Sequence, residues 1–99
     1  MSEWKRVDTS EASFPNRREE RNYGNGLEAV VGVSASGAAY HRVTFDGDVV
    51  MSTSIQIPYG VDVDGPEAAA CIEERKTYAE RAAAYLQKFA AEYESRRRS

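Results

Sequence analysis

Residues 66–98 read PEAAACIEERKTYAERAAAYLQKFAAEYESRRR, with no glycine and no proline after the first position. An apolar side chain recurs every seven residues along this stretch, at Ile72, Ala79, Leu86 and Tyr93. Seven residues make about two turns of an α-helix, so these side chains share one face. Asp64 or Gly65 can cap the start, and Glu67 suits the positive end of the helix dipole. The stretch therefore predicts one long amphipathic helix.

Upstream of the helix, three segments alternate apolar and polar side chains in the way that β-strands do. The segments are residues 27–35, 39–45 and 48–57. Ser36-Gly37 and Asp46-Gly47 separate them, and the Asp-Gly pair tolerates the positive φ angles that tight hairpin turns need. Pro58 ends the third segment, because proline cannot donate to a β-ladder. These signals predict a three-stranded antiparallel meander.

The apolar face of such a meander must be covered, and the predicted helix is the long element available to cover it. The expected fold class is α+β, with a three-stranded antiparallel meander followed by one long C-terminal helix (β-β-β-α). Strict alternation along the third strand puts these side chains on one face: Val49, Met51, Thr53, Ile55 and Ile57. The same rule turns His41 inward, beside Val43 and Phe45.

Residues 1–26 form a separate compositional zone, in which five basic and five acidic side chains surround a few isolated apolar ones. Neither the strand period nor the helix period is sustained there. We expect an extended or disordered polar arm, followed by a single β-β-β-α domain over residues 27–99. Trp4 and Phe14 either anchor a partner or dock on the chain's own core, and the sequence leaves both alternatives open.

The predicted helix is longer than the predicted sheet. At about 1.5 Å per residue it spans about 50 Å, whereas a strand of about ten residues spans about 33 Å. The helix would therefore overhang the sheet by about 15 Å. The overhang carries apolar side chains, and an exposed apolar patch marks an interaction site. The residues expected at the interface are Trp4, Phe14, Tyr85, Leu86, Phe89 and Tyr93.

The net charge of the chain is −3, and it is unevenly spread. Residues 27–65 hold five acidic side chains against a single basic one, Arg42, which disfavours binding to phosphate backbones. Nucleic acid is still an alternative partner, because strands followed by a helix is the layout of some proteins that bind single strands. The residues that would bind it are Tyr40, Arg42, Arg96, Arg97 and Arg98.

We find no catalytic, metal-binding or phosphate-binding motif in the sequence, and we expect no enzyme activity, no cofactor and no metal. His41 is the sole histidine, and its inward position favours a packing role over that of a catalytic base. Asp62-Val63-Asp64-Gly65 has the start of a calcium loop, but the residues after Pro66 lack the remaining ligands. Turn and capping roles explain these aspartates.

Cys71 is the sole cysteine, so a disulfide within the chain is impossible and a zinc site built on cysteines is not expected. The sequence shows neither a signal-peptide pattern nor an apolar run of membrane-spanning length. We therefore expect a soluble, cytoplasmic protein with no membrane partner.

Small size, a polar arm and an acidic sheet are typical of accessory or phage-encoded proteins that act by binding. We expect a non-enzymatic protein-interaction module that forms a homo-oligomer, with a homodimer as the first expectation, or that joins a larger assembly as a small accessory subunit. The helix of a second copy would cover the overhang in a short, coiled-coil-like contact. One alternative is the nucleic-acid-binding accessory protein described above. Another is a small ligand-binding protein or enzyme whose site forms only between subunits.

Overall fold

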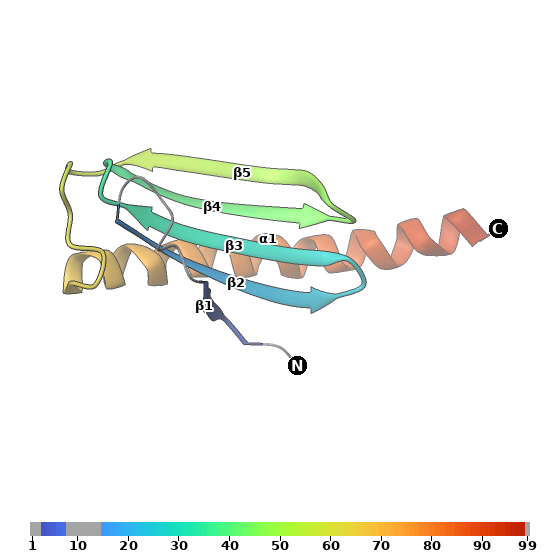
Figure 1. The fold of residues 1–99 in the computed structure, drawn as a ribbon. Helices are drawn as coiled ribbons and strands as arrows, with labels where there is room; N and C mark the ends of the chain where they lie inside the picture. Colours follow the sequence, from blue (N-terminus) through green and yellow to red (C-terminus); the bar gives the residue numbers. More distant parts are fainter. Residues whose placement is uncertain (1–2, 8–14, 99) are drawn as a thin grey trace.

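The computed structural model of the chain describes residues 3–7 and 15–98, and within them it shows one β-sheet packed on one long helix (Figure 1). For residues 90, 91 and 93–98 it describes the backbone alone. The elements are β1 (Lys5–Val7), β2 (Asn16–Gly24), β3 (Leu27–Ser34), β4 (Ala38–Phe45), β5 (Asp48–Gln56) and α1 (Pro66–Arg98). Each strand pairs antiparallel with the next along the chain, so the sheet order is β1-β2-β3-β4-β5.

The α+β class, the antiparallel sheet and the C-terminal helix are confirmed. The expected number of three strands is wrong, because the sheet has five strands within the described residues. The two additional strands, β1 and β2, lie in the region 1–26, for which we expected an extended arm. β2 is nine residues long and pairs with β3 from Asn16 to Gly24, so it is a full member of the sheet.

β2 carries charged side chains on both faces, so its sequence lacks the apolar alternation by which a strand is predicted. On the face toward the helix, Arg17 Nε lies 3.1 Å from Glu19 Oε2. On the opposite face, Arg18 Nη2 lies 2.9 Å from Glu20 Oε1. Residues two apart share a face of a strand, so on each face of β2 an arginine and a glutamate form an ion pair. Pairing with β3 satisfies the backbone, and the strand forms without an apolar face of its own.

The core lies between α1 and one face of β3 and β4. The strand side chains that are almost fully buried are Leu27, Ala29, Val31, Val33, Ala39 and Val43. The helix contributes Ala68, Ile72, Ala79 and Ala83, each with 0% exposure. Three of these four helix residues are alanine, so the helix lies close to the sheet and fills the space with little side-chain volume.

β5 departs from the strict alternation that we expected along it. Val43 pairs with Met51, whereas the next residue, Thr44, pairs with Val49, so Val50 is an additional residue in a β-bulge. Met51 lies on the helix face with Val43, but the bulge moves Val49 to the outer face with Thr44. The expected position of Val49 beside Met51 is therefore wrong. Val49 and Val50 are exposed, at 56% and 47%.

α1 continues past the end of the sheet, as its length predicted. Its C-terminal part extends beyond the β2–β3 and β4–β5 turns (Figure 1), and the longest dimension of the molecule is 52 Å. Among the described side chains, Leu86 is the last on the helix to pack against the core, and Phe89, one turn later, is 52% exposed. The overhang therefore begins just after Leu86.

Candidate protein-protein interface

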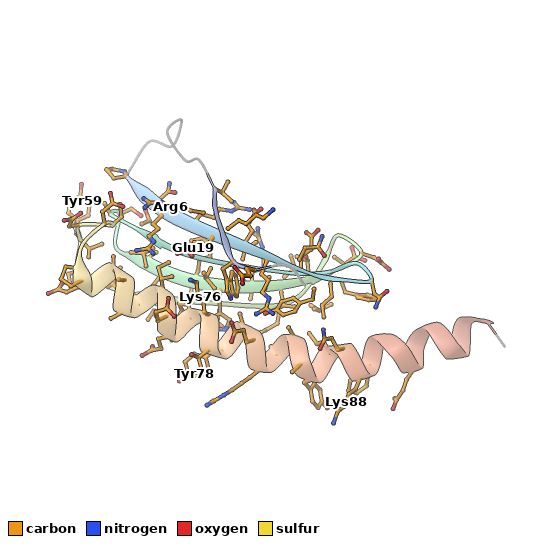
Figure 2. The ribbon with its side chains drawn as sticks, turned by 90° about the horizontal axis from the view of Figure 1, so that it is seen from below. Arg6, Glu19, Tyr59, Lys76, Tyr78 and Lys88 are labelled. Atoms are coloured by element: carbon orange, nitrogen blue, oxygen red, sulfur yellow. The ribbon has the colours of Figure 1, made fainter. Side chains whose placement is uncertain are left out.

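The two flanks of α1 differ in how far the rest of the chain covers them. On the β2 side, polar contacts join the helix to the sheet. Lys76 Nζ lies 2.8 Å from Glu19 Oε1 on β2, and Figure 2 shows both side chains between the sheet and the helix. One turn later, Glu80 accepts a hydrogen bond of 2.8 Å from Trp4 Nε1 and lies 3.3 Å from Arg21 Nη1. We call these five residues, Trp4, Glu19, Arg21, Lys76 and Glu80, the closed flank.

β1 completes the closed flank and is itself held in place. The ring of Trp4 packs against the core and lies 5.7 Å below Lys76 Nζ, which is a cation–π distance. Arg6 Nη2 lies 2.6 Å from Asp64 Oδ1, so β1 is also tied to the loop that precedes the helix. Of the two roles considered for Trp4, docking on the chain's own core is the one observed.

The opposite flank of α1, toward β5, is open. The exposed large apolar or aromatic side chains of the described residues are Val49, Val50, Ile55, Tyr59, Tyr78, Tyr85 and Phe89. The first three belong to β5, Tyr59 follows β5, and the last three belong to α1. We call this set the open flank. Six of these seven side chains belong to β5 or to the side of α1 that faces β4 and β5, and the closed flank has none of them, so the open flank is the candidate interface.

Helix geometry explains why the three aromatic residues of α1 belong together. Tyr78 lies toward β4, because its ring stacks on the ring of His41 with centroids 5.9 Å apart and planes 14° apart. At about 100° per residue, Tyr85 and Phe89 fall within about 20° of Tyr78 around the helix. The rings of Tyr85 and Phe89 also contact each other, with centroids 5.2 Å apart. An aromatic strip therefore runs along the β5 side of α1 and continues onto the overhang.

The backbone edge of β5 lies beside the open flank and is also available for contacts. β5 is the last strand of the sheet, so one side of its backbone is unpaired within the described residues. From Val49 to Val61 the sequence has no charged residue. The other edge strand, β1, has only three residues, and two of them are Lys5 and Arg6. Short length and charge protect an edge strand from pairing with other chains, whereas β5 has nine residues and no charge after Asp48.

Beneath the aromatic strip lies a buried polar cluster. His41 is 3% exposed and Arg75 is 5% exposed, with Arg75 Nη1 3.4 Å from His41 Nδ1. The guanidinium of Arg75 also lies 4.9 Å from the centre of the Tyr78 ring and 2.6 Å from a carboxylate oxygen of Glu74. Burial, and secondarily the charge of Arg75, lower the pKa of His41 below its usual value. The histidine is therefore neutral at pH 7 and serves as a flat surface on which Tyr78 packs.

The expected interface residues are distributed as follows. Tyr85 and Phe89 are exposed on the open flank, whereas Leu86 packs against the core of its own chain and Trp4 belongs to the closed flank. Phe14 and the side chain of Tyr93 lie outside the described residues. The expected site is thus reduced to its aromatic helix residues, to which the structure adds Tyr78.

The residues expected to bind nucleic acid do not gather on one surface. Tyr40 and Arg42 lie on the outer face of β4, away from the helix, and the Tyr40 ring covers Gly32, where any Cβ would overlap it. Arg96, Arg97 and Arg98 belong to the end of α1 beyond the sheet, and their side chains lie outside the described part of the chain (Figure 1).

The outer face of the sheet is nearly balanced in charge. Arg18 is paired with Glu20 across this face. Next to this pair is a shallow hollow of about 220 Å³ whose charged lining residues are Glu3, Lys5, Glu20, Arg21 and Glu28. Its three acidic side chains outnumber its two basic ones, so the hollow has no excess of positive charge for a phosphate ligand.

The structure adds the free edge of β5 and four exposed residues to the interface residues expected from the sequence: Val49, Val50, Ile55 and Tyr59. The uncharged run from Val49 to Val61 was the available signal, because an edge strand is ordinarily interrupted by charge. That signal has meaning only once the sheet order is known.

No protein-family model, curated protein or solved structure matches this chain. Within residues 3–7 and 15–98, no group of three or more His, Cys, Asp or Glu side chains is placed to hold a metal ion. In the same part of the chain, no helix combines the length and the apolar character that crossing a membrane requires.

Proposed function

We propose that this protein is a non-enzymatic protein-interaction module that assembles with itself through the open flank. The observation that supports this most directly is the gathering of its exposed large side chains on β5 and on one side of α1. Aromatic side chains are enriched in the centres of protein interfaces, and three of them follow one another along the helix here. Membership of a larger assembly would use the same surface.

The asymmetry between the flanks supports the proposal. Ion pairs and the indole of Trp4 cover the flank of α1 that faces β2, so this flank is covered by the chain's own residues. On the other flank, Tyr85 is 64% exposed and Phe89 is 52% exposed. Burying such side chains stabilises an assembly by about 25 cal/mol for each Å² of apolar surface removed from water.

The test is the mass of the purified protein in solution, measured by light scattering at tens of micromolar. We expect a dimer for the wild-type chain and a shift toward the monomer for Phe89→Glu, because the charge would be buried at the interface. Gln87→Glu is the matched control. It adds the same negative charge at an exposed position on the side of the helix that carries Lys76 and Glu80. A wild-type monomer, or equal effects of the two variants, would contradict self-association through this flank.

A nucleic-acid-binding accessory role is the second proposal. It is supported by Tyr40 and Arg42, which share the outer face of β4. The role requires salt-sensitive retention on single-stranded DNA or RNA that is lost when Arg96, Arg97 and Arg98 are changed to Ala. The absence of binding at low salt would rule it out.

A cytoplasmic location is also part of the proposal. Its support is the single cysteine, Cys71, which is free and partly buried. A chain with one unpaired thiol suits a reducing compartment.

A further inference from the structure

We infer that the occupant of the open flank is a second copy of this chain, whose β5 strand pairs antiparallel with β5 about a two-fold axis at Thr53. The two five-stranded meanders then form one continuous ten-stranded sheet. This inference rests on the proposed self-association and goes further, because it names the paired element, its register and the residue on the axis.

The backbone of β5 presents a regular set of groups at its free edge. Ile57 donates its N–H to the carbonyl of Gly37, at 2.9 Å, so its backbone groups turn toward the chain that enters β4. Backbone direction repeats every two residues along a strand, which turns Thr53 and Ile55 toward β4 as well. The N–H and C=O groups of Ser52, Ser54 and Gln56 therefore point away from the sheet, at the correct spacing for another antiparallel strand.

The register is set by the side chains on the helix face. With Thr53 on the axis, Met51 of one copy lies opposite Ile55 of the other, twice, and the two Thr53 side chains face each other. Ser52 then lies opposite Ser54 on the outer face. The bulged residue Val50 falls opposite Gln56, at the end of the paired segment, where a bulge disturbs the ladder least.

Charge favours a second copy of the chain as the occupant. Between Val49 and Ile57 the strand has no charge, so antiparallel self-pairing places no like charges opposite each other. Asp48 lies opposite Pro58 in this register, outside the paired segment. The other sheet edge cannot make the equivalent contact, because β1 has three residues and includes Lys5 and Arg6.

The two-fold axis also brings the helices into the interface. An axis perpendicular to the sheet leaves both α1 helices on the same face and exchanges the two ends of the sheet. α1 starts at the end of the sheet where the loop with Tyr59 lies and overhangs the opposite end (Figure 1). The overhang with Tyr85 and Phe89 is therefore carried to the same end as Tyr59 of the second copy, which is 77% exposed in the single chain.

The helices are needed for the interface to be large enough. A stable interface buries about 1,200–2,000 Å² in total, and one pair of short strands falls below that range. The aromatic side chains of the open flank supply the remaining area, because they line the space above the two β5 strands. Strand pairing gives the contact its register, and the aromatic residues give it area.

The test is disulfide formation between engineered cysteines in a Cys71→Ala background, which removes the one native thiol. Thr53→Cys places two cysteines directly opposite each other in a non-hydrogen-bonded pair, whose Cα atoms lie about 4.5 Å apart, within the range of about 4.4–6.8 Å that a disulfide spans. Gln56→Cys is the control, since it lies on the same exposed edge but about 20 Å from its own copy in this register. We expect at least a tenfold faster covalent dimer for Thr53→Cys under mild oxidation, and equal rates would overturn the inference.

A second variant separates this inference from the proposed function. Ser54→Pro removes an outward N–H without breaking the ladder to β4, so the folded chain is kept and the strand pair is lost. We expect a monomer whose circular dichroism spectrum matches that of the wild type. A wild-type dimer that resists Ser54→Pro and shows no preferred cross-linking at Thr53 would retain the proposed function and reject the strand pairing. A wild-type monomer would reject both.

Discussion

His41 is kept neutral by its surroundings. Arg75 faces it from α1, Tyr78 stacks on it from the same helix, and Thr53 and Val31 are its neighbours on the two adjacent strands. Glu74 is bound to Arg75, and among the described residues no carboxylate contributes to the pKa shift of His41. Burial and the nearby guanidinium both disfavour the imidazolium, which is why the pKa is lowered. The cluster links the core to the aromatic strip of the open flank.

A lowered histidine pKa makes stability depend on pH in a defined direction. The unfolded chain binds a proton near pH 6.5, whereas the folded chain binds it only at a lower pH. Stability is therefore fully present above about pH 6.5 and is lost as the pH falls through this value toward the folded-state pKa. We expect the free energy of unfolding to fall between pH 7.5 and pH 5.5, with a contribution from His41 of at most about 1.4 kcal/mol per pH unit. Urea titrations at several pH values measure it.

His41 is the sole histidine, so proton NMR can follow its titration without assignment ambiguity. His41→Gln should flatten the pH dependence in this range. Arg75→Met should raise the pKa of His41 but leave it below 6.5, because burial, the larger cause, remains. A wild-type pKa at or above 6.5 would show that the histidine is not held neutral.

At the scale of the secondary-structure elements, β2 shows how charged residues can form an internal strand. Glu19 is 6% exposed and is bound by Arg17 on its own strand and by Lys76 on the helix. It therefore joins the strand to α1 at the centre of the closed flank. Glu20, the next residue, has its partner Arg18 on the outer face, where both are partly exposed.

This pair of neighbours provides a matched comparison. Glu19→Ala leaves Lys76 and Arg17 without their shared carboxylate in a buried position, and we expect it to lower the free energy of unfolding by about 2 kcal/mol. Glu20→Ala removes a surface ion pair and should cost less than about 1 kcal/mol. Chemical denaturation of both variants measures the difference. Equal costs would mean that the closed flank does not depend on the buried carboxylate.

The elements that could be predicted from the sequence are those that have a local signal. Pro66 opens the helix as predicted, and Asp46 and Gly47 form a hairpin turn with φ angles of 50° and 85°. Asn25 and Gly26, at the end of the region for which we expect an arm, also have positive φ angles, of 55° and 82°. They form the β2–β3 turn. β2 could not be predicted from apolar alternation, because both its faces carry ion pairs in place of apolar side chains.

At the scale of the whole molecule, the position of a strand in the sheet decides what its sequence means. The aromatic overhang of α1 could be predicted, because helix length and spacing are local properties. The free edge of β5 could not, because it depends on β1 and β2 occupying the opposite edge. With three strands, Leu27 to Ala35 would have formed the second edge, and β5 would not have stood out. Within the described residues, the added strands leave β5 as the one long edge strand, with no charge after Asp48.

The ten-stranded sheet predicts that the effect of dilution on amide hydrogen exchange alternates from one residue of β5 to the next. The amide N–H groups of Thr53 and Ile55 point toward β4 in the single chain, whereas those of Ser52, Ser54 and Gln56 point outward. In the dimer both sets are hydrogen-bonded, so hydrogen exchange should be slow at all five residues at high protein concentration. On dilution below the dissociation constant, exchange should become fast at the outward set alone, because β4 still protects the others.

Ser54→Pro should show the diluted pattern at every concentration, with fast exchange at Ser52 and Gln56. Its thermal midpoint should also lose the concentration dependence that the wild-type dimer has, since only an assembly is stabilised by mass action. Exchange that is fast at the outward amides of the wild type at high concentration would show that the edge stays open to water. In that case the aromatic strip would have to hold the two copies together without the strands.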